Sequence, residues 1–201
     1  LSGLVGSEMC IRDRIISGHD IEFLKKHNIT HVMIARLESD DVAEDRAAEE
    51  LATGLAGMGV HREGPATGRC NIFAGQKGLL RVDANMVDAV NMIDEAITVA
   101  TLPDWRLVEE GEMIATVKII PFAVPKSLLE KCCKLVGNLA CLHVLPFKPK
   151  RVGLIATTLP GLKAGVVRKT SEVLQKRLAI GGSELIEECL DRRVDFTYGC
   201  C

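Results

Sequence analysis

The residues best suited to chemistry lie in a short turn near the C-terminal end of the sequence, after a run typical of a buried strand. Thr157 and Thr158 supply hydroxyl groups, and Gly161 allows close approach of a ligand to the backbone. Lys163 adds a positive charge. Because free N–H groups at a helix N-terminus bind anions, this turn could hold a phosphorylated ligand. The alternative is an ordinary strand-to-helix connection, since the turn matches neither a Walker loop nor a G-x-G-x-x-G motif.

A second candidate site is a glycine-rich loop predicted over residues 64–78, which contains the sequence TGRCN at residues 67–71. An arginine and an asparagine in such a loop could contact a ligand, since long loops are often functional. A solvated loop explains the same composition more simply, and it is the interpretation that we favour.

Metal binding is less well supported. Several acidic side chains between residues 38 and 45 could bind a cation through their oxygens, but helix capping and the helix dipole explain most of them. They are Glu38, Asp40, Asp41, Glu44 and Asp45. The histidines are scattered, and the cysteines lack the spacing of a zinc site. We therefore predict no metal ligands, and we expect the cysteines among Leu and Val at residues 132, 133 and 141 to be small hydrophobic side chains.

Composition excludes several classes of protein. The chain has 201 residues, 47% of them hydrophobic, which is enough for one or two globular domains. A net charge of −2 and only 3% aromatic residues argue against nucleic-acid binding. The sequence has no apolar run of about 18 residues and no secretory signal, so we expect a soluble cytoplasmic protein with no membrane contact.

The first part of the chain, residues 15–146, is predicted to be a mixed α/β domain. Ser17, or the residues just after it, can cap a short helix, and residues 30–37 have the composition of a strand. Residues 39–41 are expected to cap an amphipathic helix that ends at Gly57. Further strands are predicted at residues 79–82, 96–102 and 113–122, with helices after Asp83 and from Pro125 to about Leu135.

Residues 146–149 mark a domain boundary, since two prolines and two lysines lie within the five residues 146–150, between apolar sequence and a new βα pattern. The uninterrupted apolar run at 152–157 predicts a buried parallel strand. A helix is predicted at 162–179, followed by a strand from 184, which makes a βαβ unit. The residues expected to face the sheet are Leu162, Val166, Val173, Leu174 and Leu178. The predicted fold class is therefore α/β.

Both ends of the chain are irregular. Residues 1–14 include SEMCIRDR, which resembles a translated adapter, and we interpret them as a non-native tail outside the fold. The periodicity also stops after the strand that begins at residue 184. We interpret the chain as a fragment truncated at both ends.

Several longer strings resemble one family. The most specific is ATVKIIPFAVP at residues 115–125. The others lie at residues 20–24, 32–38, 41–48, 67–71, 94–103, 151–154, 159–163 and 169–170. Together they resemble the molybdopterin-binding proteins of bacterial molybdenum-cofactor biosynthesis over about residues 15–188. The family is related to the domain of molybdopterin molybdotransferase and molybdopterin adenylyltransferase.

The resemblance implies a fold and a ligand. Residues 151–201 would be the first βαβ part, truncated, of a three-layer molybdopterin-binding α/β domain. The ligand or substrate would be molybdopterin, a pterin with a phosphate and a dithiolene, with Mg²⁺ and molybdate as further expected groups. The pterin phosphate would bind at the turn that contains Thr157, Thr158, Gly161 and Lys163.

The resemblance leaves the activity open. A molybdotransferase relative would insert molybdate into an adenylylated pterin, although this fragment lacks the later elements on which the related enzymes depend, so its catalytic residues are unknown and we expect it to be inactive. The alternative is a non-catalytic pterin-binding or regulatory module of a larger fused nucleotidyltransferase, in which residues 15–146 recognise the ligand. A nucleotidyltransferase, fused or separate, and a second copy of the chain are the expected protein partners.

Overall fold

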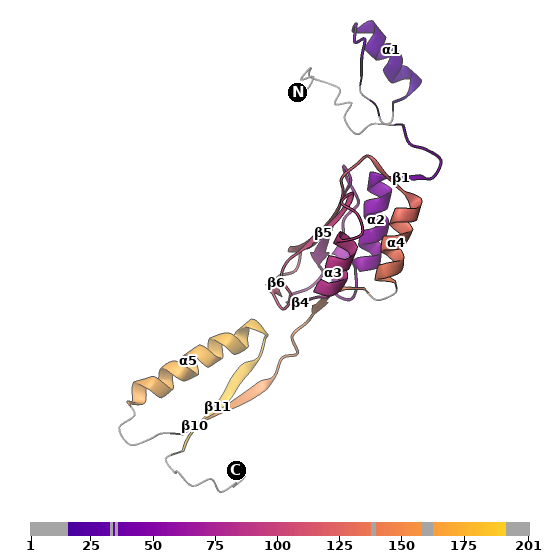
Figure 1. The fold of residues 1–201 in the computed structure, drawn as a ribbon. Helices are drawn as coiled ribbons and strands as arrows, with labels where there is room; N and C mark the ends of the chain where they lie inside the picture. The colour runs from indigo at the N-terminus through magenta and orange to yellow at the C-terminus, as the bar shows by residue number, and fades with distance from the viewer. Residues whose placement is uncertain (1–15, 33, 35, 138–139, 158–162, 192–201) are drawn as a thin grey trace.

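The computed structural model describes residues 16–32, 34, 36–137, 140–157 and 163–191. They form a mixed α/β chain with several antiparallel sheets and, near the C-terminus, one parallel pair of strands. Figure 1 shows a central body built from residues 41–145 and a smaller unit from residues 151–191. Among these residues there is no helix with both the length and the apolar character needed to cross a membrane.

The first helix, α1 (Gly18–Lys26), begins as the sequence predicts. Ser17 is its N-cap, and the backbone N–H of Asp20 donates to the Ser17 hydroxyl at 3.3 Å. The Asp20 carboxylate in turn accepts from the Ser17 backbone N–H at 2.8 Å, which completes a capping box. Lys25 and Lys26 lie in the last turn, where the helix dipole favours positive charge.

The central body contains a four-stranded and a three-stranded antiparallel sheet. The larger sheet has the order β2-β3-β7-β5, from β2 (Val60–Arg62), β3 (Arg69–Ala74), β7 (Met113–Ile119) and β5 (Ile97–Thr101). The smaller sheet has the order β6-β4-β9, from β6 (Leu107–Val108), β4 (Gly78–Val82) and β9 (Leu142–Leu145). The short strands β1 (Asp41–Ala43) and β8 (Ala123–Pro125) pair with each other.

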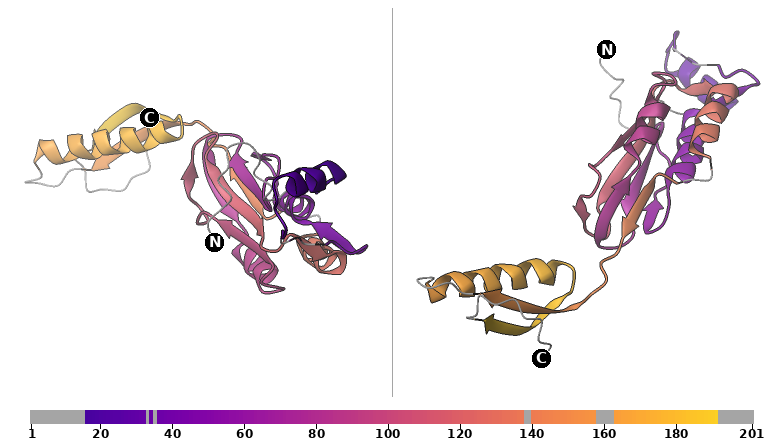
Figure 2. Two further views of the ribbon diagram at one scale, coloured as in Figure 1. Left: turned by 90° about the horizontal axis from the view of Figure 1, so that it is seen from above. Right: turned by 60° about the horizontal axis from the view of Figure 1, so that its bottom comes forward.

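Three helices of this body, α2 (Glu44–Leu55), α3 (Ala84–Asn91) and α4 (Lys126–Val136), lie on one side of the sheets (Figure 2). Burial alternates along β3, and along β7 except at Ile114 and Ala115, which are both buried, so one face of the larger sheet is apolar and packs against the helices. The largest fully buried side chains of this core include Leu51, Leu55, Ile72, Ile114 and Val117. The opposite face of β3 and β7 carries the more exposed residues, Arg69 and Lys118 among them.

Two predictions near the N-terminus are wrong. The described residues between 30 and 37 form no strand; Ile34 and Leu37 are exposed, and β-branched composition makes no strand without a neighbour to pair with. Helix α2 is also not capped by residues 39–41, because Ala43 is its N-cap and has no side-chain hydrogen bond. Asp41–Ala43 pair with β8 instead, and the carbonyl of Phe122 accepts the first helical N–H, that of Glu44, at 2.9 Å.

The loop predicted over residues 64–78 is also partly wrong, because β3 occupies Arg69–Ala74 within it. Cys70, Ile72 and Ala74 are fully buried in alternation with less buried residues. The glycines around this segment obscure that period of two, and the strand is stabilised by β2 and β7 on its two sides. The predicted helix after Asp83 and the helix after Pro125 are both confirmed.

The C-terminal unit consists of β10 (Arg151–Thr157), α5 (Ala164–Ile180) and β11 (Glu184–Asp191). β10 and β11 are parallel, with Arg151 opposite Glu184 and Thr157 opposite Asp191, so the predicted βαβ connection is confirmed. The prediction that residues 152–157 form a buried strand is wrong, because the residues of β10 alternate between exposed and half-buried. The linker before it packs on the unit: a Cβ added at Gly181 would lie 3.1 Å from the Phe147 ring. The Lys150 backbone N–H also donates to the Ser183 hydroxyl at 2.9 Å.

The predicted inward face of α5 is partly wrong. Val166 and Val173 are 49% and 47% exposed, whereas Ser171 is buried and Leu174 and Leu178 are half-buried. Both faces of α5 carry apolar residues, and the helix can cover the β10–β11 pair with only one of them. Leu162 lies outside the described residues.

Candidate functional site

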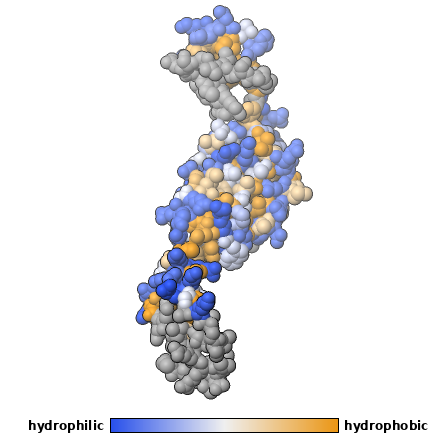
Figure 3. All heavy atoms as spheres, turned by 90° about the vertical axis from the view of Figure 1, so that its left-hand side faces the viewer, coloured by the Kyte–Doolittle hydropathy of each residue, from blue (hydrophilic) through white to orange (hydrophobic). Residues whose placement is uncertain are grey.

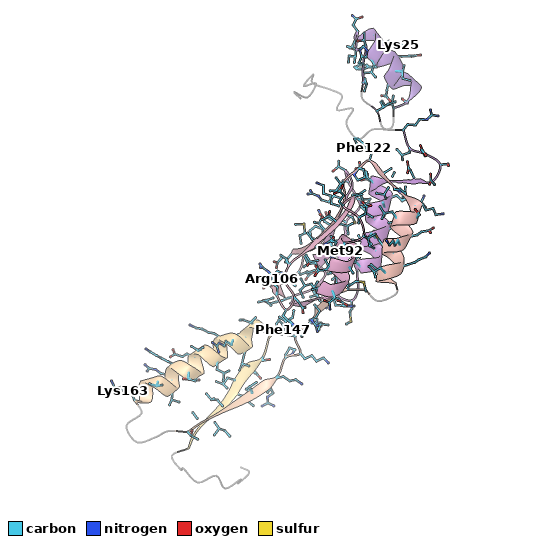
Figure 4. The ribbon with its side chains drawn as sticks, in the orientation of Figure 1. Lys25, Met92, Arg106, Phe122, Phe147 and Lys163 are labelled. Atoms are coloured by element: carbon cyan, nitrogen blue, oxygen red, sulfur yellow. The ribbon has the colours of Figure 1, made fainter. Side chains whose placement is uncertain are left out.

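The turn predicted as the ligand site joins the carboxyl end of β10 to the start of α5. Thr157 is the last residue of β10 and is exposed, and Lys163 is the exposed N-cap residue of α5. Thr158 and Gly161 lie outside the described residues. Figure 4 shows Lys163 at the end of α5 far from Phe147, which lies in the linker. The two described residues thus lie where strand carboxyl ends and helix N-termini favour ligands.

The start of α5 is suited to an anion on electrostatic grounds. The cap residue Lys163 makes no side-chain hydrogen bond to the helix, and its carbonyl accepts from the Val166 N–H at 2.9 Å. The first turn contains no acidic residue. Basic residues outnumber the acidic residue Glu172 along the helix; they are Lys163, Arg168, Lys169, Lys176 and Arg177. Positive charge and the helix dipole therefore act in the same direction.

A cavity of about 440 Å³ lies along α5, but it does not include Thr157 or Lys163. It is lined by one face of the helix, from Val166, Lys169, Thr170, Val173, Leu174 and Arg177. Its apolar part is the face that sequence analysis assigned to the sheet. Among the described residues the predicted site is therefore an exposed corner rather than an enclosed pocket.

The second candidate, residues 67–71, is a tight turn followed by a strand. Ala66 and Arg69 exchange backbone hydrogen bonds of 2.9 and 3.1 Å, and Thr67 and Gly68 between them have φ of 52° and 71°. Positive φ at both central residues is typical of a type I′ hairpin turn. The Gly68 N–H donates to Asp45 at 2.8 Å, which ties the turn to the start of α2.

A cavity of about 290 Å³ lies beside this turn. It is lined by Glu44, Thr67, Arg69, Lys118, Ile119, Ile120 and Phe122. Arg69 and Lys118 come from neighbouring strands and lie directly opposite each other in the ladder. Sequence reasoning found Arg69 but missed Lys118, because the pairing of residues 49 positions apart has no local signal.

Two of the acidic residues between 38 and 45 accept hydrogen bonds from the backbone. The Asp41 carboxylate accepts from the Glu38 N–H at 2.9 Å, and Asp45 accepts from Gly68. Glu44 and Asp45 lie in the first turn of α2, as the dipole argument predicts. Within the part of the chain that the structure describes, no three His, Cys, Asp or Glu side chains are grouped to hold a metal ion.

The four cysteines whose side chains the structure describes are poor nucleophiles. Cys70, Cys132 and Cys141 are buried in the core. Burial raises the pKa of the Cys141 thiol to about 11, and burial with the nearby Glu50 carboxylate raises the pKa of Cys133 to about 11. Since the thiolate is the reactive form, these side chains act as small hydrophobic groups.

Comparison with known proteins adds no relative: no protein-family model, curated protein or solved structure matches the chain.

Proposed function

We propose that the chain is a molybdopterin-binding protein acting in molybdenum-cofactor biosynthesis in the cytoplasm, and that residues 151–191 begin a three-layer molybdopterin-binding domain. The observation that carries the proposal is the parallel arrangement of β10 and β11 with α5 as their crossover. This arrangement supports the resemblance because the family's domain begins with a βαβ unit at the same place in the sequence.

In this proposal the pterin phosphate binds at the start of α5. Lys163 supplies charge, the first free N–H groups of the helix donate to phosphate oxygens, and the Thr157 hydroxyl donates from the end of β10. Thr158 and Gly161 complete the proposed site from the sequence alone. If the protein is a molybdotransferase relative, the reaction that follows is insertion of molybdate into the adenylylated pterin.

The alternative function is pterin binding without catalysis, as a module of a fused or partner nucleotidyltransferase. One observation favours recognition by the first part of the chain in that case. The cavity beside Arg69 and Lys118 is lined by two cations, whereas the α5 corner is not enclosed among the described residues.

Binding of 6-phosphomethylpterin to the full chain, followed by pterin fluorescence at low ionic strength, tests the proposal. Lys163→Ala is expected to weaken binding about tenfold, because hydrogen bonds to charged groups contribute about 1.5–3 kcal/mol and 1.4 kcal/mol is a factor of ten. Lys176→Ala is the matched control, since Lys176 is an exposed lysine of the same helix without an ion pair among the described residues.

Equal affinity for the wild-type chain and Lys163→Ala would remove the α5 site and favour the alternative function. Absence of any pterin binding by the wild-type chain would defeat both and indicate a structural interaction domain.

A further inference from the structure

The central body has a cavity that the proposed phosphate site at α5 does not use and that enters only the alternative function. We propose that the cavity beside the 66–69 turn binds a small organic anion with an apolar ring, held by Arg69 and Lys118. Its volume of about 290 Å³ is at the lower end of small-molecule sites. The proposal does not depend on the proposed phosphate site at α5, because it uses no residue of the C-terminal unit.

The arrangement of the two cations is the first argument. Arg69 on β3 and Lys118 on β7 are directly opposite in an antiparallel ladder, where like charges destabilise the pair. Both are exposed, and neither has a salt bridge within the described part of the chain. On the other side of Lys118 the ladder places Thr98, which brings no negative charge. An anion between the two cations would relieve this repulsion.

The backbone of the turn is the second argument. Thr67 lines the cavity with φ of 52°, a left-handed conformation that is unfavourable for a β-branched residue. The turn is held there by the Gly68 N–H on Asp45 and by the Ile119 N–H, which donates to the Gly68 carbonyl at 2.7 Å. Residues held in such conformations are often found at ligand sites, and Thr67 is one of the residues that line this cavity.

The remaining lining sets the shape of the ligand. Ile120 and Phe122 are 55% and 54% exposed and line the same cavity, so they offer an apolar surface to a ring. Figure 4 shows Phe122 at the end of the central body nearest to α1. The Glu44 carboxylate lies against Gly68, since a Cβ added there would be 2.6 Å from Glu44 Oε2. Because the Glu44 carboxylate lines the cavity, it disfavours a ligand that carries a second anionic group.

Calorimetric titration of the full chain with phenyl phosphate in a low-salt buffer tests the site, with inorganic phosphate and benzoate as further probes. Phenyl phosphate is expected to bind more tightly than inorganic phosphate because of Ile120 and Phe122. Comparison with benzoate distinguishes a phosphate site from a carboxylate site. Arg69→Gln and Lys118→Gln are each expected to weaken binding of the preferred aromatic anion about tenfold.

Thermal unfolding distinguishes a loss of ligand binding in Arg69→Gln or Lys118→Gln from misfolding of the variant. Each variant removes one of two opposed like charges, so its Tm is expected to equal or exceed that of the wild type. Lys131→Gln, which changes an exposed lysine on α4 without an ion pair among the described residues, should keep wild-type affinity.

Equal binding by the wild type, Arg69→Gln and Lys118→Gln would overturn the proposal, as would the absence of binding to either aromatic anion. Loss of binding in Lys163→Ala alone would also overturn it, because the probe would then occupy the start of α5.

Discussion

The turn at residues 66–69, which leads into β3, requires a glycine at position 68. Gly68 has a positive φ and is pressed between the Glu44 carboxylate and the carbonyl of Ile119, which would lie 2.8 Å from an added Cβ. A side chain at this position therefore meets both an unfavourable backbone conformation and a steric clash.

Gly68→Ala is expected to lower the free energy of unfolding by about 1–3 kcal/mol, the usual cost of a residue held in an unfavourable backbone region. Urea denaturation followed by circular dichroism measures the change. Gly64→Ala is the matched control, because an added Cβ at Gly64 has no neighbour within 4 Å. Similar losses in both variants would contradict the steric argument.

Asp104 is the residue from which we expect a pH dependence. Its carboxylate accepts from the Val82 N–H at 2.9 Å and from Arg81 at 3.1 Å, and these bonds, led by the one from Val82, lower the pKa of Asp104. The Arg81 guanidinium also lies 3.9 Å from the centre of the Trp105 ring. A carboxyl with a lowered pKa stabilises the folded state when ionised and loses that contribution as the pH falls through the folded pKa.

We therefore expect the stability of the wild type to decline below about pH 4, and Asp104→Asn to decline less over the same range. The measurement is the urea midpoint of both proteins between pH 2.5 and 6. Asp88→Asn, at an exposed carboxylate on α3, should instead follow the wild-type curve. Parallel curves for Asp104→Asn and the wild type would show that the Val82 bond does not contribute.

Among the elements, α2 contributes most clearly to the core of the central body. Its apolar residues recur at three- and four-residue spacing, and Ala48, Leu51, Ala52 and Leu55 are all fully buried. This helix was predictable because the periodic signal is long and local. Its N-cap was not, because the first N–H of α2 is accepted by Phe122, which is distant in sequence.

Leu51→Ala is expected to cost about 2–5 kcal/mol of stability, since it leaves a cavity in the core. Leu135→Ala serves as the control, because Leu135 lies on α4 and is 40% exposed. Its cost should be well below that of Leu51→Ala when both are measured by urea denaturation. Comparable costs would contradict the placement of α2 over the sheet.

The short strands could not be predicted from the sequence. β2, β6, β8 and β9 have between two and four residues, too few for a period of two to be recognised. Residues 30–37 have a strand-like composition but no pairing partner among the described residues, whereas β3 is a strand despite the glycines beside it. Whether each of these segments forms a strand depends on pairing with a segment distant in sequence. The same kind of pairing brings Lys118 beside Arg69.

At the scale of the whole molecule, the central body and the C-terminal unit differ in how much they bury. The body has an extensive core, whereas Ile155 and Ile186 of the β10–β11 pair are 73% and 48% exposed. A two-stranded sheet with one helix has little stability of its own. Figure 3 shows hydrophobic residues interspersed with hydrophilic ones on the face of the central body turned to the viewer.

Limited proteolysis of the native chain is therefore expected to cleave residues 151–191 before residues 41–145, because local unfolding exposes the unit with the fewer buried contacts. Mass spectrometry of the early fragments identifies the cut sites. First cuts within the secondary structure of the central body would contradict the expected order of stability.

The linker has a practical consequence for anyone who wishes to produce the C-terminal unit by itself. Phe147 rests on Gly181, Pro149 lies 3.4 Å from a Cβ built at Gly182, and Lys150 is bonded to Ser183. The linker residues Phe147, Pro149 and Lys150 are therefore structurally part of the C-terminal unit. A gene segment for that unit should begin at Pro146, since starting at Arg151 would remove the aromatic and proline side chains that pack against Gly181 and Gly182.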